Sequence, residues 1–118
     1  QYYKKFNVRG LEEKDKIKLI EQAKKNEEAG VFSIVLECVS TSVAREITKL
    51  IKIPTIGIGA SGYCDGQILV TDDMLGLSGF YPKFVKKFVN LNKIIEKGVQ
   101  KYRNAVINNK FPTDKNTF

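Results

Sequence analysis

The sequence contains no histidine and no tryptophan, and only one methionine, two cysteines and three prolines among 118 residues. The lack of histidine excludes a Ser-His-Asp triad, a histidine general base and a histidine-ligated zinc ion from within this segment. Cys38 and Cys64 lack the spacing of a metal site and are too few for a disulfide framework. We therefore expect reduced thiols in a cytoplasmic protein.

Long apolar runs are also absent: none approaches the ~20 residues of a membrane-spanning helix, so we expect no membrane contact. The charge is unbalanced, with 20 lysines and arginines against 13 acidic residues and a net charge of +7. A basic balance suits nucleic acid, anionic lipid or an anionic small molecule. Because the lysines are spread along every expected helix, we interpret most of them as solvated helix faces and expect no nucleic acid as a partner.

The apolar pattern alternates between helical and strand periods. It predicts helices over residues 12–28, 42–51, 82–89 and 91–108, and strands over residues 31–36, 55–59 and 68–72. Gly30 stands where a helix C-cap glycine belongs. The near-continuous apolar run of residues 31–36 is typical of a parallel strand buried on both faces. This order predicts an α/β fold with a parallel sheet. The chain begins at Gln1 without methionine, and we interpret it as the closing portion of a larger domain, most plausibly a barrel.

Chemistry in a parallel α/β fold gathers at the carboxyl ends of the strands. Glu37 closes the first apolar strand between Leu36 and Cys38. A partly desolvated glutamate has a raised pKa and is a better base for a C–H proton. A strand-end glutamate paired with lysine or arginine remains the alternative.

Two further stretches carry weaker signals. "GIGASG", residues 57–62, resembles a phosphate loop but lacks the following helix, so close backbone approach at glycine is the preferred interpretation. Asp65 is interpreted as a turn residue before Gly66. Asp72 and Asp73 could bind a metal, but adjacent strand residues point to opposite faces, and one of them is expected to cap the following segment.

Several of these motifs occur together in a known order: "KKFNVRG", "VLECV", "IPTIGIGA", "CDGQILV", "LGL" and "PKFVKKF". The ordered set covers essentially the whole chain and resembles the ketopantoate hydroxymethyltransferase family. The resemblance implies that residues 1–118 are the C-terminal part, about three βα units, of a single (β/α)8 TIM barrel of the phosphoenolpyruvate/pyruvate superfamily. The N-terminal strands would then lie outside this chain, and the isolated segment should be inactive.

The resemblance also implies a function in pantothenate biosynthesis. Enzymes of this family transfer a hydroxymethyl group from 5,10-methylenetetrahydrofolate to 3-methyl-2-oxobutanoate, giving 2-dehydropantoate, with Mg²⁺ polarising the keto acid. By this resemblance Glu37 is the general base, and Ile58 and Ile68 contact the isopropyl side of the substrate. The metal ligands are expected upstream of Gln1, and the protein is expected to be a homo-oligomer acting on small molecules.

The chain departs from the family pattern at four positions. Ser40 stands where the family usually has proline, Ser61 where it often has glycine, and Asp72 and Asn116 where histidines are usual. Two alternatives to the transferase remain open. One is another metal-dependent 2-oxo acid lyase of the same superfamily, and the other is a non-catalytic basic binding module.

Overall fold

The computed structural model describes residues 6–118, which form two compact units. The first unit comprises the chain up to Leu69 together with Pro82–Val85, and the second comprises Val70–Tyr81 and Lys86–Phe118. Residues 1–5, part of the predicted N-terminal loop, lie outside the described residues.

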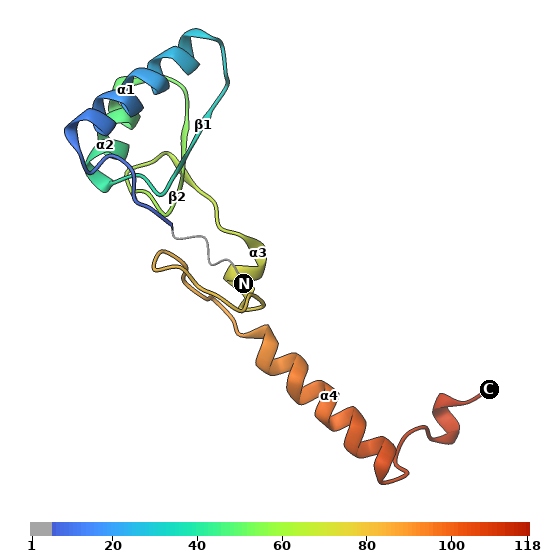
Figure 1. Cartoon of the computed structure of the whole chain (residues 1–118). Coiled ribbons are helices and arrows are strands. Elements are labelled where there is room, and N and C mark those ends of the chain that lie inside the picture. The colour runs from blue at the N-terminus through green and yellow to red at the C-terminus, as the bar shows by residue number, and fades with distance from the viewer. Residues whose placement is uncertain (1–5) are drawn as a thin grey trace. The chain divides into compact units, whose positions relative to one another are not determined.

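The first unit is a parallel sheet that is preceded by one helix and has a second helix between its first two strands (Figure 1). Its elements are α1 (Glu13–Glu28), β1 (Ile34–Glu37), α2 (Thr41–Leu50), β2 (Thr55–Ile58) and β3 (Gly66–Gln67). The three strands pair in the order β1-β2-β3, all parallel. The predicted α/β class and parallel sheet are thus confirmed. Gly30, at φ +85° just after α1, confirms the predicted helix stop.

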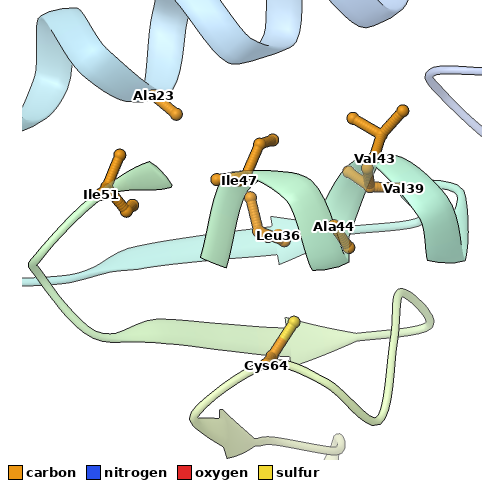
Figure 2. Packing of buried hydrophobic residues seen from close by; sticks show 8 residues of the cluster. All are labelled: Ala23, Leu36, Val39, Val43, Ala44, Ile47, Ile51 and Cys64. Carbon is orange, nitrogen blue, oxygen red and sulfur yellow. The ribbon is translucent and has the colours of Figure 1, made fainter. Parts of the chain in front are cut away.

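Helices α1 and α2 cover one face of this sheet, and the apolar core lies among the two helices and the sheet (Figure 2). The buried core side chains are Ala23, Leu36, Val39, Val43, Ala44, Ile47, Ile51 and Cys64. Val43, Ala44 and Ile47 recur on one side of α2 at helical spacing, so a single helix face contributes three core residues. Packing of this face, more than helix propensity, holds α2 in place.

The opposite face of β1 and β2 is uncovered in the described chain. Leu36 of β1 is buried and pairs with buried Gly57 of β2, whereas Val35 is 54% exposed and pairs with half-buried Ile56. The prediction that residues 31–36 are buried on both faces is therefore wrong for this chain. Its apolar run had suggested two covered faces, but helices cover only the Leu36 face.

The second unit contains α3 (Thr71–Leu75), α4 (Leu91–Ile107) and a 3₁₀ turn (Asp114–Asn116). Helix α4 confirms the helix predicted over residues 91–108, and its N-cap Asn90 accepts a hydrogen bond from the Lys93 amide at 3.3 Å. Among the described residues, no helix is long and apolar enough to cross a membrane.

Two predicted elements of this region are wrong. The strand predicted over residues 68–72 is replaced by β3, which ends at Gln67, and by α3, whose first turn contains Asp72 and Asp73. Acidic residues favour the positive end of a helix, which suits Asp72 and Asp73 in this first turn. The helix predicted over residues 82–89 does not form, and the Phe88 amide donates to the Met74 carbonyl (2.9 Å) and not to a preceding turn of such a helix.

Candidate active site

Glu37 is the last residue of β1, and its register partner in β2 is Ile58. Directly paired residues of neighbouring strands project from the same face, so both side chains lie on the uncovered face of the sheet. The Glu37 side chain is exposed in this chain, and Ile58 is half-buried. The desolvation predicted for Glu37 is therefore absent in the described chain and would need a further wall over this face.

Ile68 follows β3 directly, and its backbone N–H donates to the Gly57 carbonyl at 3.0 Å. This bond extends the pairing of β2 and β3 by one residue, so the alternation of side chains puts Ile68 on the face of Ile58. The structure thus brings Glu37, Ile58 and Ile68 to the carboxyl ends of adjacent strands on one face. Their predicted roles in catalysis and substrate binding stay predictions.

Cys38 turns the backbone immediately after Glu37. Its φ of +52° is in the left-handed region, which non-glycine residues enter at a cost of about 1–3 kcal/mol. Its N–H donates to the Ile58 carbonyl (2.9 Å), while its carbonyl accepts from the Arg9 amide (2.8 Å). One residue therefore bonds to β2 on one side and to the Arg9 segment on the other, which an extended residue could not do. Burial raises the pKa of the Cys38 thiol, so the thiol stays protonated at neutral pH.

The Arg9 segment is itself fixed to the start of α1. The Arg9 guanidinium binds Asp15 through both carboxylate oxygens, Nε to Oδ2 at 3.0 Å and an Nη atom to Oδ1 at 2.6 Å. The Gly10 amide also donates to Asp15 Oδ2 at 2.7 Å. These bonds, the one from Arg9 foremost, lower the pKa of Asp15 to about 2. No pattern rule joins residues six apart at a helix start, so sequence reasoning missed this pair.

The "GIGASG" stretch is a place of close approach. A Cβ on Gly59, at φ +61°, would lie 2.7 Å from the Phe84 ring, and one on Gly57 would lie 2.9 Å from the Gln67 side chain. Phe84 also packs edge-on against Phe6, with ring centroids 5.5 Å apart. The preferred interpretation is confirmed for Gly57 and Gly59 but not for Gly62, whose Cβ position has no heavy atom within 4 Å. Phe84 and Phe6 therefore lie beside the carboxyl end of β2, a feature that the sequence did not indicate.

The acidic residues after β2 have structural positions. Asp65 Oδ2 accepts hydrogen bonds from the Thr55 amide (2.8 Å) and hydroxyl (3.0 Å), which lower the pKa of Asp65. This confirms Asp65 as a residue of the turn. Asp72 and Asp73 lie inside α3, whose N-cap is Val70. The prediction that one of them caps the following segment by its side chain is therefore wrong.

A cavity of about 210 Å³ lies between α1 and β1. Leu19 and Ala23 line it from the helix, and Leu36 and Glu37 line it from the strand, together with Arg9. The cavity lies along the edge of the sheet, because β1 is the first strand in the sheet order. On this edge Arg9 and Val39 form an isolated parallel bridge, so the segment around Arg9 pairs with the chain just after the carboxyl end of β1.

Comparison with known proteins identifies the family of this chain, which the geometry alone does not. The family model described as ketopantoate hydroxymethyltransferase matches residues 1–114. The chain belongs to this family. The matched segment includes Glu37, Ile58 and Ile68, so all three candidate residues lie within the ketopantoate hydroxymethyltransferase region.

Curated relatives agree with the family model. The chain is 50% identical over 113 residues to "3-methyl-2-oxobutanoate hydroxymethyltransferase" of Pelagibacter ubique, covering 96% of this chain and 44% of that protein. A protein of the same name from Clostridium botulinum (strain 657 / Type Ba4) is 54% identical over 114 residues, covering 96% of this chain and 42% of the relative. The chain therefore spans less than half the length of these ketopantoate hydroxymethyltransferases.

The family resemblance implies Mg²⁺, a cation that prefers several oxygen ligands, often carboxylates, in octahedral geometry. In residues 6–118, no group of three or more histidine, cysteine, aspartate or glutamate side chains could hold a metal ion. This part of a ketopantoate hydroxymethyltransferase does not by itself fit the metal.

Proposed function

We propose that the complete protein containing this chain transfers a hydroxymethyl group from 5,10-methylenetetrahydrofolate to 3-methyl-2-oxobutanoate, giving 2-dehydropantoate. Membership of the ketopantoate hydroxymethyltransferase family carries this proposal. The position of Glu37 supports it, because the carboxylate lies at the carboxyl end of a parallel strand, where α/β enzymes place their reactive groups. The Mg²⁺ ligands would come from residues outside this chain.

The fold is proposed to be the C-terminal part of a (β/α)8 barrel. Helices cover one face of the sheet and leave the other open, as the outer and inner faces of such a barrel require. The free edge of β1, with the Arg9–Val39 bridge beside it, supports continuation of the parallel sheet in that direction. Closing the barrel would also cover Glu37 and supply the desolvation that the exposed carboxylate lacks here.

Glu37 is proposed to remove the C3 proton of 3-methyl-2-oxobutanoate. The C3–H electron pair would move toward the ketone to form an enolate, whose C3 then bonds to the one-carbon unit of the folate. Both C–N bonds that hold this unit on the folate break, water supplies the hydroxyl group, and tetrahydrofolate leaves. Ile58 and Ile68 share the face of Glu37 and would contact the apolar isopropyl group. Burying that group between two isoleucines adds substrate affinity of about 25 cal/mol per Å² of apolar area removed from water.

Exchange of the C3 proton with D₂O tests the role of Glu37 without requiring the folate. In the complete protein with Mg²⁺, Glu37→Gln should slow exchange by about 10²–10⁴-fold, the usual contribution of a general base. Glu28→Gln, at an exposed glutamate at the end of α1, is the matched control and should exchange at the wild-type rate. Wild-type exchange by the Glu37 variant would refute the proposed base. Carbon–carbon cleavage of 2-oxo acids without any folate requirement would favour a lyase instead.

A further inference from the structure

The Phe84 ring rests directly on the backbone just after β2. A Cβ on Gly59 would lie 2.7 Å from the ring atoms Cγ and Cδ1 and 3.1 Å from Cδ2. Gly59 thus combines a missing side chain with a left-handed φ of +61° at the one place where this ring lies. Phe6 contacts the ring from a second side, with the two ring planes at 86°. All three residues belong to the first unit.

The two rings adjoin the carboxyl ends of both long strands. Phe6 precedes the Arg9 segment, which bonds to the turn after β1, and Phe84 rests on the residue after β2. These are the strand ends that carry Glu37 and Ile58. Phe84 is half-buried and Phe6 is 44% exposed, so part of the aromatic surface stays accessible at this end of the sheet.

The position of Ile58 indicates what such a ring would contact. In the proposed reaction Ile58 contacts the isopropyl group, whose central carbon, C3, gains the one-carbon unit. Reacting atoms approach each other to about 3–3.5 Å, so the folate ring that carries this unit must come close to Ile58. Gly59 is the next residue, with a Cα atom only about 3.8 Å away. Because side chains fill the interior of a (β/α)8 barrel, the large folate has to approach from this carboxyl end.

We propose that Phe84 contacts the bicyclic ring of the folate co-substrate, with Gly59 and Phe6 holding the phenyl ring in place. The inference rests on the proposed function. Aromatic side chains suit a flat heterocycle, because offset-stacked and edge-on contacts are both favourable. Phe84 and Gly59 also occur in "PKFVKKF" and "IPTIGIGA", two of the motifs that carry the family resemblance. Phe84 has no part in proton removal in this assignment, which requires only Glu37, the metal and the keto acid.

Two assays of the complete protein with Mg²⁺ separate the folate from the keto acid. Exchange of the C3 proton requires the keto acid but no folate, whereas hydroxymethyl transfer requires both. Phe84→Leu keeps an apolar side chain and removes the aromatic plane. It should raise KM for 5,10-methylenetetrahydrofolate by about 3–10-fold, the size of an aromatic stacking contribution. C3-proton exchange and KM for 3-methyl-2-oxobutanoate should stay within about twofold of wild type, since only a contact to the folate is lost.

Binding of tetrahydrofolate, the released product, gives a readout that is independent of turnover. Its Kd, measured by calorimetry, should rise by the same factor in Phe84→Leu, and Phe84→Tyr, which keeps the ring, should bind with nearly the wild-type Kd. Phe32→Leu is the matched control, because this ring is 88% exposed and lies before the amino end of β1. If Phe84→Leu does not fold, Phe84→Met takes its place, since methionine also lacks the aromatic plane and adapts to irregular spaces.

Two results would overturn the inference. One is an unchanged KM and Kd for the folates in the Phe84 variant. The other is an equal loss of C3-proton exchange and of transfer, which would show that the ring supports the whole site and not the folate. Failure of the proposed function is distinguishable from both, because then the wild-type protein would not transfer the hydroxymethyl group, or Glu37→Gln would exchange at the wild-type rate.

Discussion

The backbone amide and the hydroxyl of Thr55 both donate to one oxygen of the Asp65 carboxylate, at 2.8 and 3.0 Å. Thr55 is fully buried at the start of β2, and its hydroxyl also lies 2.8 Å from the hydroxyl of Thr48 in α2. The pair therefore fixes the turn before β3 to the start of the neighbouring strand. Since Ile58 ends β2 and Ile68 follows β3 directly, the pair also helps to set their register on the uncovered face.

Removing the Asp65 carboxylate should destabilise the first unit. Asp65→Ala leaves the buried Thr55 amide without its acceptor, which costs about 1–3 kcal/mol. Asp65→Asn keeps a carbonyl oxygen and should lose less. Thermal unfolding of the complete protein measures both, with Glu21→Ala, on the exposed surface of α1, as a control that stays within about 0.5 kcal/mol. A Tm of Asp65→Ala equal to that of the control would contradict this prediction.

The sequence predicted much of the first unit because its signals are local. The apolar period of residues 12–28 and the glycine stop at Gly30 correspond to α1, and the apolar run ending at Glu37 corresponds to β1. The uncovered face of β1 could not be predicted, because exposure depends on segments packed from elsewhere.

The predictions that were wrong or missing also have physical causes. The run "ILVT" has strong β-propensity, but β3 finds a partner for only Gly66 and Gln67 in the described chain. Strand formation depends on pairing, which propensity does not report. At the candidate site, Glu37 was predicted from its place at a strand end together with the family resemblance, and its role stays a prediction. The bonds that join Cys38 and Ser40 to Arg9 and Gly10 were not predicted, because they connect segments about 30 residues apart.

Gly59 should not tolerate a side chain. Its φ of +61° disfavours any L-residue, and an added Cβ would meet the Phe84 ring at 2.7 Å. We expect Gly59→Ala to cost about 1–2 kcal/mol for the backbone and about 1–3 kcal/mol more for the clash. Gly62→Ala is the matched control, because no heavy atom lies within 4 Å of its Cβ position. Adding Phe84→Ala to the Gly59 variant should relieve only the clash. A Gly59→Ala protein as stable as Gly62→Ala would contradict this account.

Ile47 carries the packing of α2 against the sheet. It is 1% exposed, whereas Leu50 on the same helix is 47% exposed. Ile47→Ala should lower the free energy of unfolding by about 2–5 kcal/mol through lost burial and a residual cavity. Leu50→Ala should cost much less, because its side chain already contacts water. Equal effects of the two substitutions on chemical unfolding would show that the core lies elsewhere.

The ion pair of Asp15 and Arg9 should make stability depend on pH in the acid range. The pKa of Asp15 is about 2 in the folded chain, with the Arg9 guanidinium as the main cause, and an unfolded aspartate has a pKa of about 3.9. A depressed folded pKa stabilises the fold above the unfolded pKa, and this contribution is lost as pH falls from about 4 to about 2. The Tm difference between wild type and Asp15→Asn should therefore be constant above about pH 5 and shrink toward pH 2.

Because the Arg9 and Asp15 side chains are both partly exposed, added salt should reduce this Tm difference. Asp114→Asn, at an exposed aspartate of the 3₁₀ turn, is the matched control for removing a carboxylate. A difference that is independent of pH would mean that the hydrogen bond to Gly10, and not the charge of Asp15, supplies its effect.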